Sequence, residues 1–449
     1  MKKILIATTI AFGILGTIFC LSRNTPIVNC ADYETYLNQT HFAKATKKIA
    51  GQINFWENKI LADPENFVYQ KKLAGLFAAD FKLTGNVQQL LRSDSLLQLI
   101  NTRIPNQHGV LYMLATNAIT RHAFLEADAY SRQVYQTGEK KFLSSLLRTD
   151  VCLERGNFQD AEYLLSDVAS DSHFDYLIRK VKALDQQGNL SEAIRIMEKA
   201  TQLAQSSGSE QLQNWSLSNL ADMYGHNGCI NQSYQTYLQA LKHNPADFHA
   251  LKGIAWIAYA HDKNSSEAKR ILGFLKALHP VPDYDFLLTE IAKFEKDTVA
   301  ALNHSLAFAS EARLPGYGNM YRRYLCALES TPPKLALAMA KADVAERPHP
   351  VSYAFLAWSM YRNGNTSAAL NILKKHVLQQ TEEPHAAFFA GVILLKTGQK
   401  EGAETYLEQA SEAAFELGPT TASEIGGYLS ELHGKTTVTV PLFSLLSEQ

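Results

Sequence analysis

Residues 214–245 read NWSLSNLADMYGHNGCINQSYQTYLQALKHNP, and this stretch decides the fold. Apolar residues recur every three or four positions on both sides of Gly228, which is the pattern of two amphipathic helices joined by a turn. Glycine accepts the left-handed conformation that ends a helix, and Pro245 blocks continuation of the second helix. The small residues Ala221 and Ser233 allow two helices to approach closely where they cross. The stretch therefore predicts one antiparallel helix pair.

The same pattern returns along the chain at a spacing of 34 residues or a multiple of it. Gly364 and Gly398 are 34 positions apart, and each follows an apolar helical segment. The segment AWIAY at 255–259 returns as AWSMY at 357–361, which is 102 positions later and three times the period. Self-similarity at a fixed period is the sequence signature of a repeat protein. We therefore expect a stack of similar helix pairs.

Rougher copies of the unit surround Gly156 and Gly188 upstream, and Ala268 and Ala301 hold the small-residue position in the middle of the chain. The repeated pattern resembles the tetratricopeptide repeat. This resemblance implies an all-α fold, a right-handed superhelical solenoid of about nine or ten helix-turn-helix units over residues 63–416. One such unit cannot bury its apolar face alone, and stacking on its neighbours supplies the missing contacts.

The two ends of the array are expected to carry caps. Residues 31–62 are assigned to an N-terminal capping helix, because Asp32–Ile60 has the pattern of one amphipathic helix. Residues 417–449 are assigned to a C-terminal capping helix, predicted over Thr421–His433, and an extended tail. The β-branched tail is expected to be a loose end or a segment that docks on a partner.

The N-terminus has the pattern of a targeting segment. Lys2 and Lys3 precede an uncharged, mostly apolar run over Ile4–Leu21, whose length lies between a signal-peptide core and a membrane-spanning helix. Residues 1–30 are therefore predicted to be a signal peptide, with cleavage conceivable after Cys30, or a retained membrane anchor. Either interpretation places the rest of the chain outside the cytoplasm, in the periplasm or envelope of a bacterium.

Composition and motifs argue against several classes of function. The 43 lysine and arginine residues nearly cancel the 44 acidic residues, so the chain lacks the cationic surplus of a nucleic-acid binder. No P-loop, zinc-protease, nucleophile-elbow or dinucleotide motif is present in the sequence. Its five cysteines are too widely spaced for a local metal site or a disulfide framework. We therefore expect no nucleic-acid partner, no metal, no cofactor and no enzymatic activity.

The resemblance also implies a candidate partner-binding groove. In tetratricopeptide-repeat proteins, positions 2, 5, 9 and 12 of each first helix tend to face the concave side of the superhelix. Mapped onto the frame, the groove candidates are Trp215, Asp222, His249, Lys252, Trp256, Tyr259, Tyr317, Tyr324, Trp358 and Tyr361, and Asp283, Glu290 and Lys293 occupy further positions of the same kind. Two interpretations stay open for the aromatic members, since they could face a partner or pack between adjacent units.

Two functional hypotheses follow. The first is a non-enzymatic scaffold that binds a peptide or protein partner in the concave groove at the cell envelope. The alternative is a small-ligand or glycan-binding component of a surface uptake system, for which aromatic residues would stack on sugars. The absence of a lipobox and of long inserted loops from the sequence counts against the alternative. The family's clamp for peptide carboxylates, built from Lys, Asn and Arg, is not reproduced at these positions.

Overall fold

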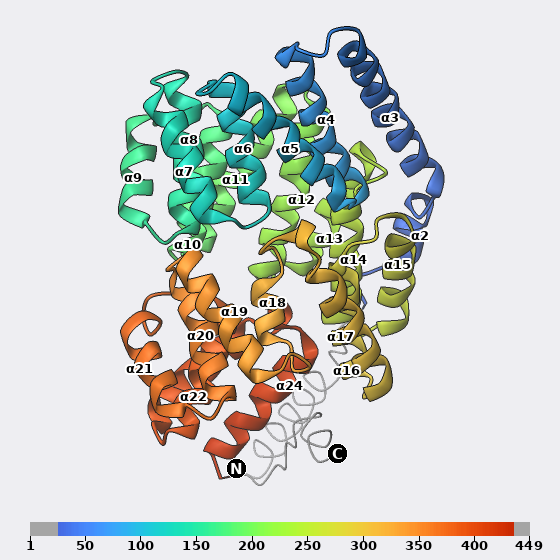
Figure 1. Cartoon of the computed structure of the whole chain (residues 1–449). Coiled ribbons are helices and arrows are strands. Elements are labelled where there is room, and N and C mark those ends of the chain that lie inside the picture. Colours follow the sequence, from blue (N-terminus) through green and yellow to red (C-terminus); the bar gives the residue numbers. More distant parts are fainter. Residues whose placement is uncertain (1–25, 435–449) are drawn as a thin grey trace, which may run out of the picture.

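The computed structural model describes residues 26–434, which form an all-α solenoid (Figure 1). Consecutive helices pack against each other in pairs, as the repeat pattern predicts. The ten pairs are α4 (Phe67–Thr84) with α5 (Val87–Arg103), α6 (His108–Thr120) with α7 (Phe124–Gln136), α8 (Lys141–Glu154) with α9 (Phe158–Asp167), α10 (Phe174–Gln186) with α11 (Leu190–Ser206), α12 (Glu210–His226) with α13 (Ile230–His243), α14 (Phe248–Ala260) with α15 (Ser265–Leu278), α16 (Pro282–Phe294) with α17 (Thr298–Ala312), α18 (Arg322–Ala327) with α19 (Pro333–Glu346), α20 (Pro350–Arg362) with α21 (Thr366–His376), and α22 (Pro384–Lys396) with α23 (Lys400–Glu412).

The turns inside the units have the geometry that their glycines predict. Gly228, Gly364 and Gly398 adopt φ values of 74°, 79° and 79°, in the left-handed region that other residues rarely enter. The small residues at the crossing points are buried: Ala221 and Ala369 are inaccessible to solvent. Close approach of the paired helices therefore follows directly from the sequence.

The eighth unit departs from the predicted frame. Its first helix is reduced to α18, and a 3-10 turn, η2 (Pro315–Tyr317), precedes it. Gly318 has φ 57° and ψ −116°, a conformation outside any helix, so the chain bends between η2 and α18. Tyr317, which the 34-residue frame places on a groove-facing helix, lies in this turn instead and packs 5.4 Å from the Tyr321 ring.

Two short helices and a long one precede the array, where the sequence predicts a single capping helix. The chain forms α2 (Cys30–Tyr33) and η1 (Glu34–Tyr36), breaks, and continues as α3 (Gln39–Ala62). The break follows from Asn38, whose extended backbone and side chain cap the N-terminus of α3. The array then begins at α4, close to the predicted boundary.

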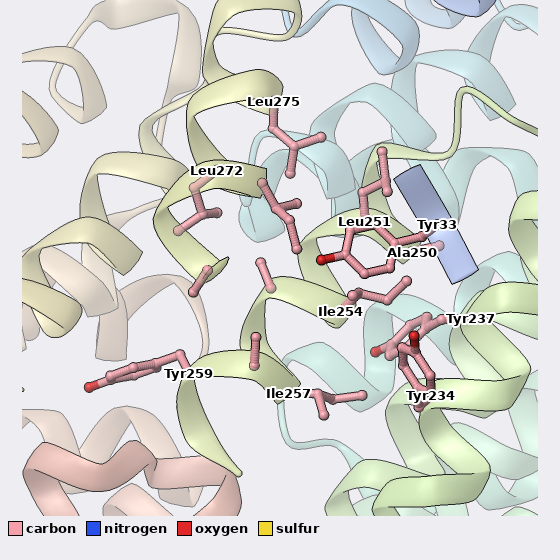
Figure 2. Packing of buried hydrophobic residues seen from close by; sticks show 14 of the residues in the cluster. Tyr33, Tyr234, Tyr237, Ala250, Leu251, Ile254, Ile257, Tyr259, Leu272 and Leu275 are labelled. Atoms are coloured by element: carbon pink, nitrogen blue, oxygen red, sulfur yellow. The ribbon is translucent and has the colours of Figure 1, made fainter. Parts of the chain in front are cut away.

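The segment before α3 docks on the middle of the array. The buried carboxylate of Asp262 accepts hydrogen bonds from the backbone N–H groups of Ile27 (3.0 Å) and Val28 (2.9 Å). Tyr33 is fully buried in the largest hydrophobic cluster, beside Tyr234 and Leu251 (Figure 2). Cleavage after Cys30, which the sequence analysis considers, would remove both contacts to Asp262.

The superhelix closes on itself, because the loops of the early units contact the loops of the late units (Figure 1). The backbone N–H of Asn319 donates to the Arg121 carbonyl at 2.9 Å, and Arg347 reaches Glu154 at 3.3 Å. Gly156 lies so near Pro348 that a Cβ atom would stand 3.2 Å from the Pro348 carbonyl oxygen. These contacts join residues nearly 200 positions apart and enclose the concave interior.

The last helix crosses that interior. Helix α24 (Ala414–Leu432) begins earlier than predicted and is interrupted at Gly418, which has φ 80° and ψ 162° and precedes Pro419. It packs against α12, α14 and α16, which are first helices of three successive units. The Trp256 Nε1–H donates to the Phe415 carbonyl at 3.2 Å, so α24 is fixed to the concave side.

Two features predicted from the sequence lie outside the described residues, namely the apolar run over Ile4–Leu21 and the tail after residue 434. Within residues 26–434, no helix is long and apolar enough to span a membrane. Four of the five cysteines are described, and all four are free thiols: Cys152 and Cys326 are buried, Cys229 is half-buried and Cys30 is exposed.

Candidate binding cavity

Closure of the superhelix leaves a central cavity of about 840 Å³ on its concave side. First helices of successive units form most of the cavity wall, and α24 forms a further part of it. The loop before α20 lines the cavity where the early units contact the late ones. A volume in this range is typical of sites that take a small molecule or a short peptide segment, since such sites span roughly 300–1,000 Å³.

The cavity wall carries more acidic than basic side chains. Eight carboxylates face four lysine and arginine side chains. The acids are Glu154, Asp185, Glu290, Glu329, Glu382, Glu383, Glu416 and Glu424; the bases are Lys293, Arg323, Arg347 and Arg362. Seven aromatic rings lie among them: Trp256, Phe286, Tyr324, Phe355, Trp358, Phe388 and Phe389. Within residues 26–434, no three histidine, cysteine or acidic side chains gather in a way that could hold a metal ion.

Negative charge accumulates on one side of the cavity, which we call the acidic wall and define by Glu290, Glu329 and Glu424. Lys293 is the cation between them, 3.1 Å from Glu290 and 3.9 Å from Glu329. Desolvation by the surrounding walls, together with Glu329 and Glu290, raises the pKa of Glu424 to about 7. One lysine therefore does not neutralise the acidic wall, and a further cation would be stabilised there.

Two segments of the chain match the family description of the tetratricopeptide repeat, residues 174–207 and residues 384–416. These segments coincide with the pairs α10 with α11 and α22 with α23. The chain contains tetratricopeptide repeats. The other helix pairs repeat the same packing without matching the family description themselves.

Two solved structures are similar to this chain at low sequence identity. The human IFIT1 dimer with PPP-AAAA has 14% identity over 72% of this chain and 76% of its own, with a TM-score of 0.45. Yeast Tom70 has 13% identity over 94% of this chain and 100% of its own, with a TM-score of 0.32. No curated protein matches the sequence. These scores are too low for any ligand to be carried over to this chain.

Three of the ten groove candidates line the cavity of the tetratricopeptide-repeat array, namely Trp256, Tyr324 and Trp358. Each is also part of the internal packing. The Trp358 ring stacks on Phe389 at 4.7 Å with an interplanar angle of 10°, and the Trp256 ring lies 5.5 Å from that of Tyr259. Trp256 and Trp358 therefore both line the cavity and pack against neighbouring rings, and whether they contact a partner stays a prediction.

The other seven candidates lie outside the cavity wall. Tyr259 and Tyr317 are 1% and 3% exposed, so neither offers surface to a partner. The polar candidates pair with one another or with neighbouring helices: His249 Nε2 lies 2.7 Å from Asp222, and Lys252 lies 3.4 Å from Asp283. Trp215 is exposed beside Phe174, and Tyr361 is half-buried beside Trp358.

Several residues of the cavity were not predicted from the sequence. Glu154 and Asp185 lie near the ends of first helices, His349 lies in a loop, and Glu424 comes from α24. None of them occupies a groove position of the repeat frame. The frame describes contacts within a unit and between adjacent units, and not the contacts that early units make with late ones. The sequence predicts a helix over Thr421–His433, within α24, but its pattern does not reveal where the helix packs.

Glu154 is expected to make stability depend on pH. Burial alone would raise its pKa, but Lys182 at 2.7 Å and Arg347 at 3.3 Å bring the pKa down to about 2, from an ordinary value of 4.5. A lowered pKa in the folded state contributes stability that is present above pH 4.5 and lost as pH falls toward 2. The loss amounts to roughly 3 kcal/mol from this group.

Urea unfolding at pH 7, 4 and 3 checks this prediction. Glu154→Gln is expected to be less stable than the wild type at pH 7, with the difference shrinking between pH 4.5 and pH 2. Glu57→Gln, which removes a carboxylate from an exposed ion pair with Arg92, is the control and should leave the pH dependence close to that of the wild type. An unchanged pH dependence in Glu154→Gln would show that Lys182 and Arg347 do not hold Glu154 ionised.

Proposed function

We propose that this chain is a non-enzymatic binding scaffold that takes a cationic segment of a peptide or protein partner into its central cavity. The observation that carries the proposal is the composition of the cavity wall, in which eight carboxylates and seven aromatic rings surround four basic side chains. Lysine and arginine side chains are attracted both to carboxylates and to aromatic faces. The repeat architecture supports the coarser part of the proposal, a binding scaffold.

Electrostatics favours a cation at the acidic wall in particular. Glu329 and Glu424 face the cavity, where the nearby cations are Lys293 and, beside Glu329, Arg362. An excess of charge of one sign in a cavity with poorly polarisable walls focuses the electric field and speeds the association of a partner of opposite charge. We therefore expect binding to weaken as salt rises.

The proposed place of action is the bacterial cell envelope. The support for this part is the N-terminal pattern alone, two lysines followed by the apolar run over Ile4–Leu21. Mass spectrometry of the protein isolated from its native membrane fraction tests it, because the mass reports whether residues 1–26 are retained. Recovery of the intact protein from the cytosol would contradict the proposal.

Neutralising the acidic wall is expected to abolish partner capture. In the double variant Glu329→Gln with Glu424→Gln, we expect at least a tenfold loss of affinity for cationic partners, since two charge-assisted contacts are removed. The matched control is Glu404→Gln with Glu431→Gln, which removes two carboxylates from exposed ion pairs outside the cavity. The measurement is quantitative mass spectrometry of proteins captured by each tagged form, followed by calorimetry with the captured protein.

Two outcomes would count against the proposal. Equal capture by the cavity variant and the wild type would show that the partner binds elsewhere. Enrichment of no protein by any form, together with thermal stabilisation by amines or oligosaccharides, would favour the second candidate function. That candidate is binding of a small ligand or glycan, and the observation that favours it is the enclosed volume of about 840 Å³.

A further inference from the structure

Helix α3 lies on the outside of the array and exposes one basic face (Figure 1). Lysines, one glycine and one phenylalanine recur there every three or four positions, which places them along one stripe of the helix: Lys44, Lys48, Gly51, Phe55 and Lys59. All five are exposed, and a Cβ built at Gly51 would meet nothing within 4 Å. With the adjoining Lys47, the four lysines and Phe55 form what we call the lysine face. It extends over about 22 Å, since an α-helix rises about 1.5 Å per residue.

The opposite face of α3 attaches the helix to the array. Five apolar side chains are half-buried on that side: Phe42, Ile49, Ile53, Trp56 and Ile60. The Phe42 ring lies 5.2 Å from that of Phe248 in α14, and the Trp56 ring lies 5.5 Å from that of Tyr69 in α4. These contacts hold α3 near both of its ends. The lysine face is therefore presented by an attached helix in a fixed orientation.

No ion pair offsets the charge of the lysine face. Within residues 26–434, none of its four lysines pairs with a carboxylate, and Glu57, the single acidic residue of α3, lies on the opposite side and pairs with Arg92 at 2.9 Å. The acidic residues that flank the helix have partners outside α3: Asp32 with the Tyr234 hydroxyl, Glu34 with Arg270, Asp63 with the Asn66 amide and Glu65 with Arg103.

Lysines around an exposed aromatic ring are suited to an anionic lipid surface. Ammonium groups are attracted to phosphate headgroups, and an aromatic ring can enter the boundary between headgroups and acyl chains. Phe55 is 52% exposed, and the Lys59 Nζ lies 5.8 Å from the centre of its ring, so ring and charge face the same surface. A regular face of this length matches a layer of headgroups better than it matches one small anion.

The chain that precedes α3 indicates the same partner. Ile27 and Val28 are fixed to Asp262, and they pack against the same hydrophobic cluster as the start of α3. Four residues separate Pro26 from the apolar run over Ile4–Leu21, a link that spans at most about 18 Å when fully extended. A membrane that takes up this run would therefore lie near the docked segment.

We propose that the lysine face of α3 is a membrane-contact surface, which binds the anionic headgroups of a lipid bilayer and holds the array against the envelope membrane. The proposal rests on the proposed function only for the place of action at the envelope. No residue of α3 lines the central cavity, so membrane contact and partner binding use separate surfaces.

Photo-crosslinking from the lysine face tests this proposal. Benzoylphenylalanine replaces Phe55 in the full chain, and the protein is illuminated with vesicles of phosphatidylglycerol and phosphatidylcholine in equal parts or of phosphatidylcholine alone. Mass spectrometry then measures the phospholipid adduct. The matched control places benzoylphenylalanine at Tyr163, which is 67% exposed on α9, at the opposite edge of the array in Figure 1.

We expect an adduct at position 55 on vesicles that contain phosphatidylglycerol, and a roughly tenfold lower yield on phosphatidylcholine alone or at high salt. Combining Lys44→Gln, Lys47→Gln and Lys48→Gln should abolish the preference for phosphatidylglycerol. The charge-matched control combines Lys341→Gln, Lys374→Gln and Lys375→Gln, which removes three exposed lysines of α19 and α21 and should leave the yield unchanged. Circular dichroism checks that both triple variants keep their helix content.

Equal adduct yields at positions 55 and 163, or equal yields from the two kinds of vesicle, would overturn the membrane contact. So would an adduct with a protein in place of phospholipid in the native membrane fraction. The proposed function fails separately, because partner capture is measured with the Glu329→Gln and Glu424→Gln variant, which leaves α3 intact. A lipid adduct at position 55 together with unchanged capture by that variant would keep the membrane contact and reject the cavity as the binding site.

Discussion

Replacing Gly253 with alanine is expected to destabilise the protein by about 2–4 kcal/mol, through overpacking and the loss of a charge-assisted hydrogen bond. Gly253 lies inside α14, and a Cβ atom there would stand 2.2 Å from the Tyr237 ring. Tyr237 is buried and donates its hydroxyl proton to the carboxylate of Asp222. The ring cannot move aside without breaking that hydrogen bond and disturbing the contact between α13 and α14.

Gly273→Ala is the matched control, because it makes the same substitution within the neighbouring helix α15. No atom lies within 4 Å of a Cβ built at Gly273, and the residue is exposed. Alanine is expected to stabilise the protein there by about 0.5–1 kcal/mol, because glycine is a poor helix former. Urea unfolding followed by circular dichroism measures both variants. Similar effects of the two substitutions would show that Tyr237 does not pack against Gly253.

The second large effect is expected at Asp343, the carboxylate that joins α18, α19 and α20. Its side chain is 3% exposed and accepts hydrogen bonds from Arg323 and Arg347, each at 3.1 Å, and from Ser352 at 2.7 Å. Burial would raise its pKa, but the two arginines hold that pKa below its ordinary value. Asp343→Ala leaves the buried guanidinium of Arg323 without its ion-pair partner and leaves Arg347 with Glu154 alone, which costs about 3–5 kcal/mol.

A double-mutant cycle separates this charge effect from a loss of packing. Adding Arg323→Met to Asp343→Ala should restore part of the lost stability, because the buried charge that lost its partner is then removed. Glu431→Ala, which breaks an exposed ion pair with Lys396, is the control and should cost less than about 1 kcal/mol. Urea titration measures the free energy of unfolding of the wild type, the two single variants and the double variant. Additive effects of the two substitutions would contradict a charge interaction between Asp343 and Arg323.

The fold was predictable from local patterns in the sequence. Turn glycines such as Gly228 and Gly398 end one helix of each pair, and small residues such as Ala221 mark the helix crossings. These signals act within one unit or between neighbouring units, so the residues that contact each other are also close together in the sequence. The eighth unit was mispredicted because Pro315 and Gly318 form a turn where the frame expects a helix.

The candidate cavity was not predictable in the same way. The frame identified Trp256, Tyr324 and Trp358, and also Glu290 and Lys293, because first helices face the concave side in every unit. It could not identify Glu154 and Arg347, which meet across 193 positions where one turn of the superhelix rests on another. Nor could it distinguish Gly253 from Gly273, since the difference lies in what packs beside each glycine.

The sequence by itself determined the repeat unit, the stacking of units and the helical character of nearly the whole described chain, because short-range helix and turn preferences decide these features. The tertiary structure alone decided that the superhelix closes, that α24 crosses its concave side, and that carboxylates from distant units line one cavity. These features depend on the small rotation between successive units accumulating over ten pairs. That accumulated rotation brings distant residues together without leaving a local pattern in the sequence.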